Sequence, residues 1–308
     1  MHVGLIDIDG GNFPNLCLMK LSTHYKRQGH TIYMLTIDDV LKGQSLFTTF
    51  SRIFGACVFD KNRDIAKKLT EQGVIVHGSG VDDETLLDEI EREYPDYSLY
   101  GIKDEAYGFL TRGCPRRCPF CIVSEKEGIT SKKVADLKQF WSGQKYIKLL
   151  DPNLLACSEH LDLLQQLASS GAWIDFTQGL DARLLTKENI ELINACKIKR
   201  IHFAWDNPKD ETTKQALINF RKESRIQDFR KMRVYVLTNY WSTHQEDLYR
   251  VYWLREHGYD PYIMIYDKPN APKETRYLQR WVNNKQIFRI IDKFENYDHK
   301  VGRGAENG

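Results

Sequence analysis

Three cysteines crowd into one short stretch of the chain. Cys114, Cys118 and Cys121 lie within eight residues, in the spacing C-x3-C-x2-C. Thiolates are the soft ligands that iron–sulfur clusters and zinc select. A cubane cluster normally takes four cysteines, so three close cysteines would leave one iron open to a small molecule. Pro115 and Pro119 disfavour a helix here and indicate a loop that can wrap a cluster.

This loop resembles the signature of the radical S-adenosylmethionine superfamily. Phe120 stands at the aromatic position of that signature, and the loop follows a strand predicted over residues 106–111. The resemblance implies a [4Fe–4S] cluster held by Cys114, Cys118 and Cys121, with S-adenosylmethionine on the fourth iron and Phe120 against its adenine. It also implies reductive cleavage of the cofactor to a 5′-deoxyadenosyl radical. An external one-electron donor, a flavodoxin or a ferredoxin, would be needed, and the substrate is not named by the motif.

Polar residues follow the next four predicted strands, which cover residues 145–150, 173–177, 200–204 and 233–237. The candidates for binding the cofactor or the substrate are Asp151, Asn153, Gln178, Arg183, Asp206 and Asn239. In β/α barrels the active site lies at the carboxyl ends of the strands. Asp151 or Asn153 could accept a hydrogen bond from the cofactor's ammonium group, because the superfamily's usual Gly-Gly-Glu is absent. Arg183 could bind its carboxylate. Each of these segments also fits an ordinary turn or surface loop.

Other interpretations of the cysteines stay open. A structural zinc site needs a fourth ligand, here Cys157 or a histidine, and would make the chain a non-enzymatic, zinc-stabilised binding protein. A thioredoxin-like pair at Cys118 and Cys121 would leave Cys114 unexplained. A radical protein that keeps the cluster but has lost turnover is a further alternative.

The N-terminus carries a second resemblance. Asp7-Ile8-Asp9-Gly10 is similar to the first motif of haloacid-dehalogenase phosphatases, in which the first aspartate is the nucleophile. The residue after the glycine is usually Thr or Val in that family, and here it is Gly11. Such an enzyme would not account for the cysteine loop.

Strand-like and helix-like segments alternate over residues 1–97. The expected strands cover residues 3–8, 31–36, 57–59 and 74–76, and the expected helices 16–28, 63–72 and 84–93, with a loop over 42–55. This pattern predicts an α/β domain with a flavodoxin- or Rossmann-like parallel sheet. It resembles the cobalamin-binding-like domain of some radical S-adenosylmethionine enzymes. That domain's Asp-x-His-x-x-Gly string is absent, so cobalamin is not expected.

The alternation continues with longer helices over residues 98–270. Six strands are expected, the last over 262–266, with helices over 134–141, 159–169, 187–196, 212–222 and 245–257. This predicts a partial (β/α)6 barrel. Residues 271–308 are expected to form a C-terminal helical extension with a frayed tail over 301–308.

Composition narrows the class of protein. The chain has 308 residues, 44 basic and 42 acidic, so its charge gives no indication of a nucleic-acid partner. It has neither a bilayer-spanning apolar run nor a signal-peptide pattern, so we expect no membrane partner and a cytoplasmic protein. Seven cysteines in such a chain are not a disulfide framework. The four scattered ones are expected to be small buried apolar residues: Cys17, Cys57, Cys157 and Cys196.

Overall fold

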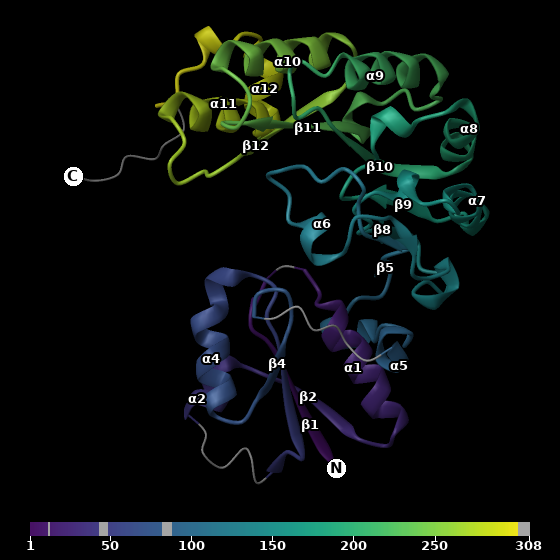
Figure 1. Cartoon of the computed structure of the whole chain (residues 1–308), viewed down its shortest axis with the longest axis vertical. Helices are drawn as coiled ribbons and strands as arrows, with labels where there is room; N and C mark the ends of the chain where they lie inside the picture. The colour runs from purple at the N-terminus through teal and green to yellow at the C-terminus, as the bar shows by residue number, and fades with distance from the viewer. Residues whose placement is uncertain (12, 43–48, 82–87, 301–308) are drawn as a thin grey trace. The chain divides into compact units, whose positions relative to one another are not determined.

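The computed structural model describes residues 1–11, 13–42, 49–81 and 88–300 (Figure 1). Strands alternate with helices and form two main sheets whose strands pair in parallel, so the protein belongs to the α/β class. It divides into two compact units, Met1–Leu110 with Glu125–Glu127 and Val134–Lys148, and Thr111–Ser124 with Gly128–Lys133 and Leu149–Gly308. Within the described ranges, no helix has both the length and the apolar character needed to cross a bilayer.

The first sheet has four strands in the order β2-β1-β3-β4, all paired in parallel. The strands are β1 (His2–Asp7), β2 (Thr31–Leu35), β3 (Arg52–Ala56) and β4 (Ile75–His77). The helices beside them are α1 (Leu16–Arg27), α2 (Ile37–Lys42), α4 (Arg63–Glu71) and α5 (Asp88–Glu91).

This four-stranded sheet is apolar on both faces. Successive side chains of a strand point to opposite faces. Val3 and Leu5 of β1 belong to a core cluster with Leu18 of α1. Ile6, on the other face, belongs to a second cluster with Leu69 of α4. Helices therefore bury both sides of the sheet.

The second sheet has six strands in the order β12-β11-β10-β9-β8-β5, so its strands follow chain order across the sheet. They are β5 (Glu105–Gly108), β8 (Tyr146–Leu149), β9 (Trp173–Phe176), β10 (Lys197–Ala204), β11 (Met232–Thr238) and β12 (Asp260–Ile265). The associated helices are α7 (His160–Ser170), α8 (Lys187–Ala195), α9 (Glu211–Glu223), α10 (His244–Glu256), α11 (Lys273–Asn283) and α12 (Lys285–Ile290). The pairings from β9 to β12 are parallel.

Helices α7 to α10 follow one side of this sheet (Figure 1). Ile201 and Phe203 of β10 are fully buried on that side. The ring of Phe203 packs edge-on against Phe220 of α9, with 4.9 Å between centroids. Arg200 and His202 lie on the other face of β10, where His202 is buried.

Two sequence predictions of local structure are wrong. Residues 57–59 are not a strand, because β3 ends at Ala56 and the amides of Val58 and Phe59 bind the carboxylate of Asp9 instead. Residues 134–141 are not an α-helix. The amides of Val134 and Ala135 donate to the carbonyl of Leu110, which leaves only a 3-10 turn over Leu137–Gln139.

The other predicted strands and helices are confirmed within a few residues at each end. Strand β3 was missed, because its residues 52–55 were predicted as part of a loop, and helix α2 was missed as well. Some predictions fall outside the described residues. They are the expected loop over 43–48, the expected helix over 84–87 and the expected frayed tail over 301–308.

Candidate iron–sulfur site

The cysteine loop, residues 113–131, leaves and rejoins the fold at one point. Its ends are β6 (Thr111–Arg112) and β7 (Lys132–Lys133), which pair antiparallel. Asp151, just after β8, accepts hydrogen bonds from the amide and the hydroxyl of Thr111 at 2.5 and 2.7 Å. The loop is therefore tied at its base to a carboxyl strand end, and Asp151 serves this attachment.

The three cysteines of the loop are free thiols near the surface. Cys114 and Cys118 are half-buried and Cys121 is exposed. The amide of Cys121 donates to the carbonyl of Cys118 at 2.9 Å. Gly113 and Arg117 adopt positive φ angles of 85° and 47°, a conformation that is rare for a residue with a side chain. The backbone thus winds between the cysteines as a loop.

Asn153 brings a polar side chain to the first cysteine. Its Nδ2 donates to Sγ of Cys114 at 3.5 Å, and its carbonyl accepts from the hydroxyl of Ser131 at 2.9 Å. The residue is only 3% exposed. No donor among the described residues reaches its Oδ1. A buried oxygen without a donor costs free energy, so it offers an acceptor to a ligand with an N–H or ammonium group.

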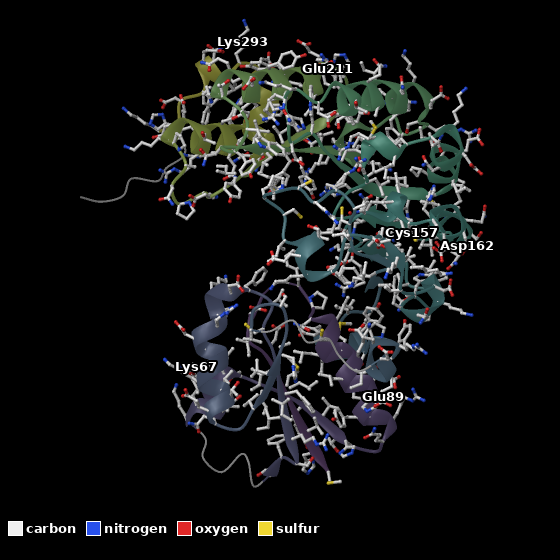
Figure 2. The ribbon with its side chains drawn as sticks, in the orientation of Figure 1. Lys67, Glu89, Cys157, Asp162, Glu211 and Lys293 are labelled. Carbon is white, nitrogen blue, oxygen red and sulfur yellow. The ribbon has the colours of Figure 1, made fainter. Side chains whose placement is uncertain are left out.

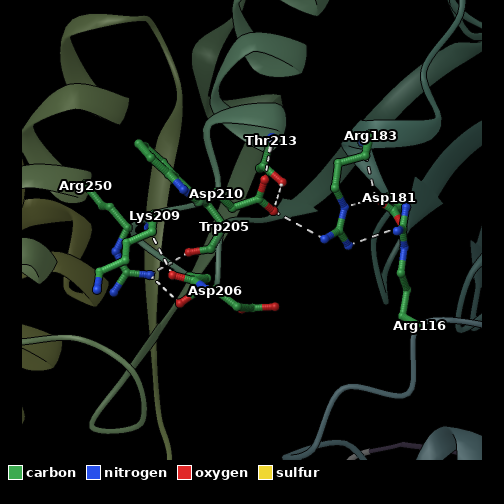
Figure 3. Close-up of polar contacts among 10 residues, drawn as sticks. Arg116, Asp181, Arg183, Trp205, Asp206, Lys209, Asp210, Thr213 and Arg250 are labelled. Atoms are coloured by element: carbon green, nitrogen blue, oxygen red, sulfur yellow. Dashed lines mark hydrogen bonds and ion pairs between the residues drawn. The ribbon is translucent and has the colours of Figure 1, made fainter.

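Arg116 of the cysteine loop begins a chain of ion pairs that ends at α9 (Figure 3). Its Nε binds the carboxylate of Asp181, which also accepts Nε of Arg183 at 2.8 Å. Nη1 of Arg183 reaches Asp210 at 3.2 Å, and Asp210 caps α9 by accepting the amide of Thr213 at 3.0 Å. Burial alone would raise the pKa of Asp181, but the two arginines outweigh it and hold this pKa below its ordinary value.

This chain of ion pairs bears on the expected role of Arg183. Three of its five N–H groups already bind protein carboxylates. Two remain for a ligand, so Arg183 can contact an added carboxylate only as one more partner of a shared network.

Arg250 of α10 holds the segment that follows β10 (Figure 3) and the last residues of β11. Its guanidinium is completely buried and donates to the carbonyls of Trp205, Asp206 and Leu237 at 2.6, 2.8 and 2.9 Å. Asp247, one turn earlier on α10, balances the charge at 2.5 Å. The path of the main chain at Asp206 is therefore held through the carbonyl of this residue.

Asp206 is an acidic group within electrostatic reach of the cysteines. Burial raises its pKa to about 6, while Arg250 and Arg183 oppose the rise. Burial also raises the pKa of the Cys118 thiol, and the charges of Asp206, Cys121 and Cys114 raise it further. Asp206 is therefore close enough to Cys118 for its charge to act on that thiol.

Phe120 packs against aromatic residues that follow β11. Its ring packs edge-on against Tyr240 and Trp241, with centroids 5.5 and 5.4 Å away, and Tyr240 packs against Tyr266 at 4.7 Å. Asn239, with a positive φ of 62°, donates its side-chain amide to the carbonyl of Tyr266 at 2.9 Å. Asn239 thus joins the β11 and β12 ends and supports an apolar, aromatic surface beside the cysteines.

Gln178 and Cys157 stand apart from this group. Gln178 is exposed and makes no hydrogen bond within the described ranges. Cys157, labelled beside α7 in Figure 2, is 1% exposed and donates its thiol to Glu159 at 3.3 Å. Cys57 and Cys196 are buried as expected, whereas Cys17 is only half-buried.

Sequence reasoning missed Asp181, Asp210 and Arg250. The first two sit in loops where nothing distinguishes them from surface carboxylates. Arg250 left a detectable signal, because Asp247 and Arg250 fall on the same helical face as the apolar Val251 and Leu254. An opposite-charge pair at i, i+3 on an apolar face indicates a buried ion pair.

The residues present fit the ligand chemistry of a cluster with one open iron. They combine three free thiols on one loop, two arginines between Cys114 and Cys118, and an unpartnered amide oxygen. In the part of the chain that the structure describes, no three His, Cys, Asp or Glu side chains already surround a common metal position. The chain matches no family model, and no curated protein is significantly similar to it in sequence.

Proposed function

We propose that this protein is a radical S-adenosylmethionine enzyme that holds a [4Fe–4S] cluster through Cys114, Cys118 and Cys121. The observation that carries the proposal is the C-x3-C-x2-C loop with Phe120, tied at its base to a carboxyl strand end. When bound and reduced, the cluster would supply the electron that cleaves S-adenosylmethionine and starts radical chemistry.

The chain's own residues would bind and orient the cofactor. The unpartnered Oδ1 of Asn153 would accept a hydrogen bond from its ammonium group. Phe120, with Tyr240 and Trp241, would cover the adenine and exclude water. Asp206 would stand near the ribose or the substrate. Asp151 would act indirectly, because its hydrogen bonds to Thr111 fix the base of the cysteine loop.

The strand orders favour a specific architecture for both sheets. The order β2-β1-β3-β4 is compatible with a flavodoxin-like domain, and the chain-order sheet from β5 to β12 with a partial (β/α)6 barrel. We propose these two folds. The electron would come from a flavodoxin or a ferredoxin. A reducing compartment such as the cytoplasm suits the free thiols.

The test is anaerobic reconstitution of the full chain with iron and sulfide, followed by reduction with S-adenosylmethionine present. We expect about four irons per chain and 5′-deoxyadenosine on chromatography. Asn153→Ala should retain the iron but raise the S-adenosylmethionine concentration needed for half-maximal nucleoside formation. Gln178→Ala, which changes an exposed residue that makes no hydrogen bond within the described residues, is the matched control and should behave as the wild type.

Three other outcomes have distinct meanings. One tightly held zinc with no nucleoside would replace the enzyme with a zinc-stabilised binding protein. A full cluster with no nucleoside under any reductant would indicate a radical protein without turnover. Nucleoside formation unaffected by Asn153→Ala would keep the enzyme and remove Asn153 from cofactor binding.

A further inference from the structure

The face of the six-stranded sheet that the helices leave open is polar, unlike the interior of an ordinary β/α barrel. Such interiors are dominated by branched apolar side chains. Residues two apart on a strand share a face, and the register places His202 beside Arg233 and Tyr235 beside Tyr262. The polar side chains of this face on β9 to β12 are Asp175, Arg200, His202, Arg233, Tyr235 and Tyr262.

Positive charge exceeds negative charge at the amino-terminal end of this face. Arg233 and Lys285 both bind Asp260, at 3.0 and 2.6 Å. Their side chains are 16% and 25% exposed, and that of Asp260 is 8% exposed. Arg200, half-buried on the adjoining strand, has no ion pair or hydrogen bond within the described residues. Asp260 therefore pairs with two of these three cations.

The neighbouring carboxylate does not remove this excess. Asp175 stands opposite Arg200 in the register, where it accepts from the hydroxyl of Thr177 at 3.2 Å and lies 3.8 Å from Nδ1 of His202. Three cations still face two carboxylates. Half-buried cations in excess of their counter-ions are costly unless an anion completes the set.

The electrostatics of two further groups agree with this geometry. Burial lowers the pKa of Lys285, and although Asp260 opposes this, Arg233 and Arg200 lower it further. Burial lowers the pKa of His202 to about 4, with Arg233 and Arg200 again contributing. Tyr262 lies beneath Arg233, 4.9 Å from its guanidinium carbon to the ring centroid, and provides a wall for the cations.

We propose that Arg200, Arg233 and Lys285 bind a carboxylate or phosphate group of the substrate. This assignment of substrate class rests on the proposed function. Asp206 lies six residues after Arg200 and two beyond the end of β10, a distance of about 20 Å if the chain is extended. The substrate is thus an elongated anion, with its acid group on these cations and its reacting carbon toward the cysteine loop.

The experiment is calorimetric titration of the reconstituted full chain with inorganic phosphate and, separately, with succinate at constant ionic strength. We expect at least one probe to bind and Arg200→Gln to weaken it about tenfold or more, because a charge-assisted hydrogen bond is lost. Arg200 has no partner to lose, so its variant should keep the thermal midpoint of the wild type. Phosphate binding alone would assign a phosphate ester, and succinate binding alone a carboxylic acid.

Arg225→Gln is the matched control. Arg225 lines a separate cavity of about 400 Å³ with Lys197 and Lys231. Its replacement removes the same charge and should leave the affinity unchanged. Weakening by Arg225→Gln instead of Arg200→Gln, or no binding of either probe to the wild type, would overturn the proposal.

The readout also separates this inference from the proposed function. Arg200-dependent anion binding without nucleoside formation would leave the anion site standing and remove the radical chemistry. Nucleoside formation without anion binding would support the radical chemistry and remove the anion site.

Discussion

The two sheets of this protein use their faces differently. The four-stranded sheet places apolar side chains on both faces, with Val3 and Leu5 in one core and Ile6 and Ile8 in another. In the six-stranded sheet, β10 buries Ile201 and Phe203 on the helix side. Its other face carries charged and aromatic residues.

The loops at the carboxyl strand ends differ in the same way. After β1, the carboxylate of Asp9 is fully used within its own neighbourhood, by the amides of Val58 and Phe59 and the side chain of Asn62. After β8, Asn153 keeps an oxygen without a donor. A sheet whose two faces are covered by helices needs no ligand to satisfy its polar groups. A sheet with a polar face and an unpartnered acceptor would be stabilised by a ligand that supplies the missing donor.

The largest expected effect is loss of the cluster. Cys118→Ala should reduce iron and sulfide to background, because the two remaining thiols cannot hold the cluster. Cys57→Ala, just after β3, should keep about four irons per chain, since that thiol is buried and directed at the carbonyl of Phe59. Full iron content in Cys118→Ala would show that the ligand set is wrong.

Breaking the Arg250 clamp should cost the most stability. Arg250→Met leaves Asp247 buried without a counter-charge and deprives the carbonyls of Trp205 and Leu237 of their donor. We expect a loss of about 3–5 kcal/mol in the free energy of unfolding, measured by urea denaturation. Arg230→Met, which breaks an exposed pair with Asp228, should cost less than about 1 kcal/mol. Equal losses in the two variants would contradict a buried clamp.

His202 should make the polar sheet sensitive to acid. Because burial lowers its pKa to about 4 from an ordinary 6.5, the unfolded chain binds a proton in this range that the folded chain refuses. Its contribution to stability is present above about pH 6.5 and is lost as the pH falls toward 4, by up to about 3 kcal/mol.

The measurement compares urea unfolding of the wild type and His202→Gln between pH 7 and pH 4. The comparison is needed because the raised pKa of Asp206, about 6, acts in the opposite direction over part of this range. The difference in the free energy of unfolding between the two proteins should change by up to about 3 kcal/mol between pH 7 and pH 4. Parallel pH profiles would mean that His202 accepts its proton in the folded state.

The smallest effect belongs to the four-stranded sheet. Asp9→Ala removes the bonds to Val58 and Asn62 at 2.6 and 2.8 Å and should lower the free energy of unfolding by about 1–2 kcal/mol. Cluster iron should be unchanged. Loss of iron from this variant would tie the first sheet to the metal site and erase the contrast between the sheets.

Most strands were predictable because their apolar runs are long and local. The failures share a physical cause. Val134, Leu137 and Trp141 have helical spacing, but the amide of Val134 is taken by Leu110, which is distant in sequence. Residues 57–59 look strand-like, yet a side chain 49 residues away binds the amide of Val58. Hydrogen bonds to residues distant in sequence determine the conformation of both segments, and a local sequence pattern carries no information about such bonds.

The candidate site was predictable to a similar degree. Strand ends collect at one edge of a parallel sheet, so Asn153 and Asp206 could be expected near the cysteines from strand order alone. The partners of Arg183 could not, because any of several surface carboxylates could have taken the place of Asp181. The roles of all these residues in cofactor binding stay predictions.

The Arg250 clamp has a consequence for sequence change. Its acceptors at residues 205, 206 and 237 are main-chain oxygens, which every amino acid provides. Substitution of the side chain at position 206 therefore leaves the path of the chain intact. Evolution, or a library of variants, can alter what this strand end recognises while the scaffold that presents it stays the same.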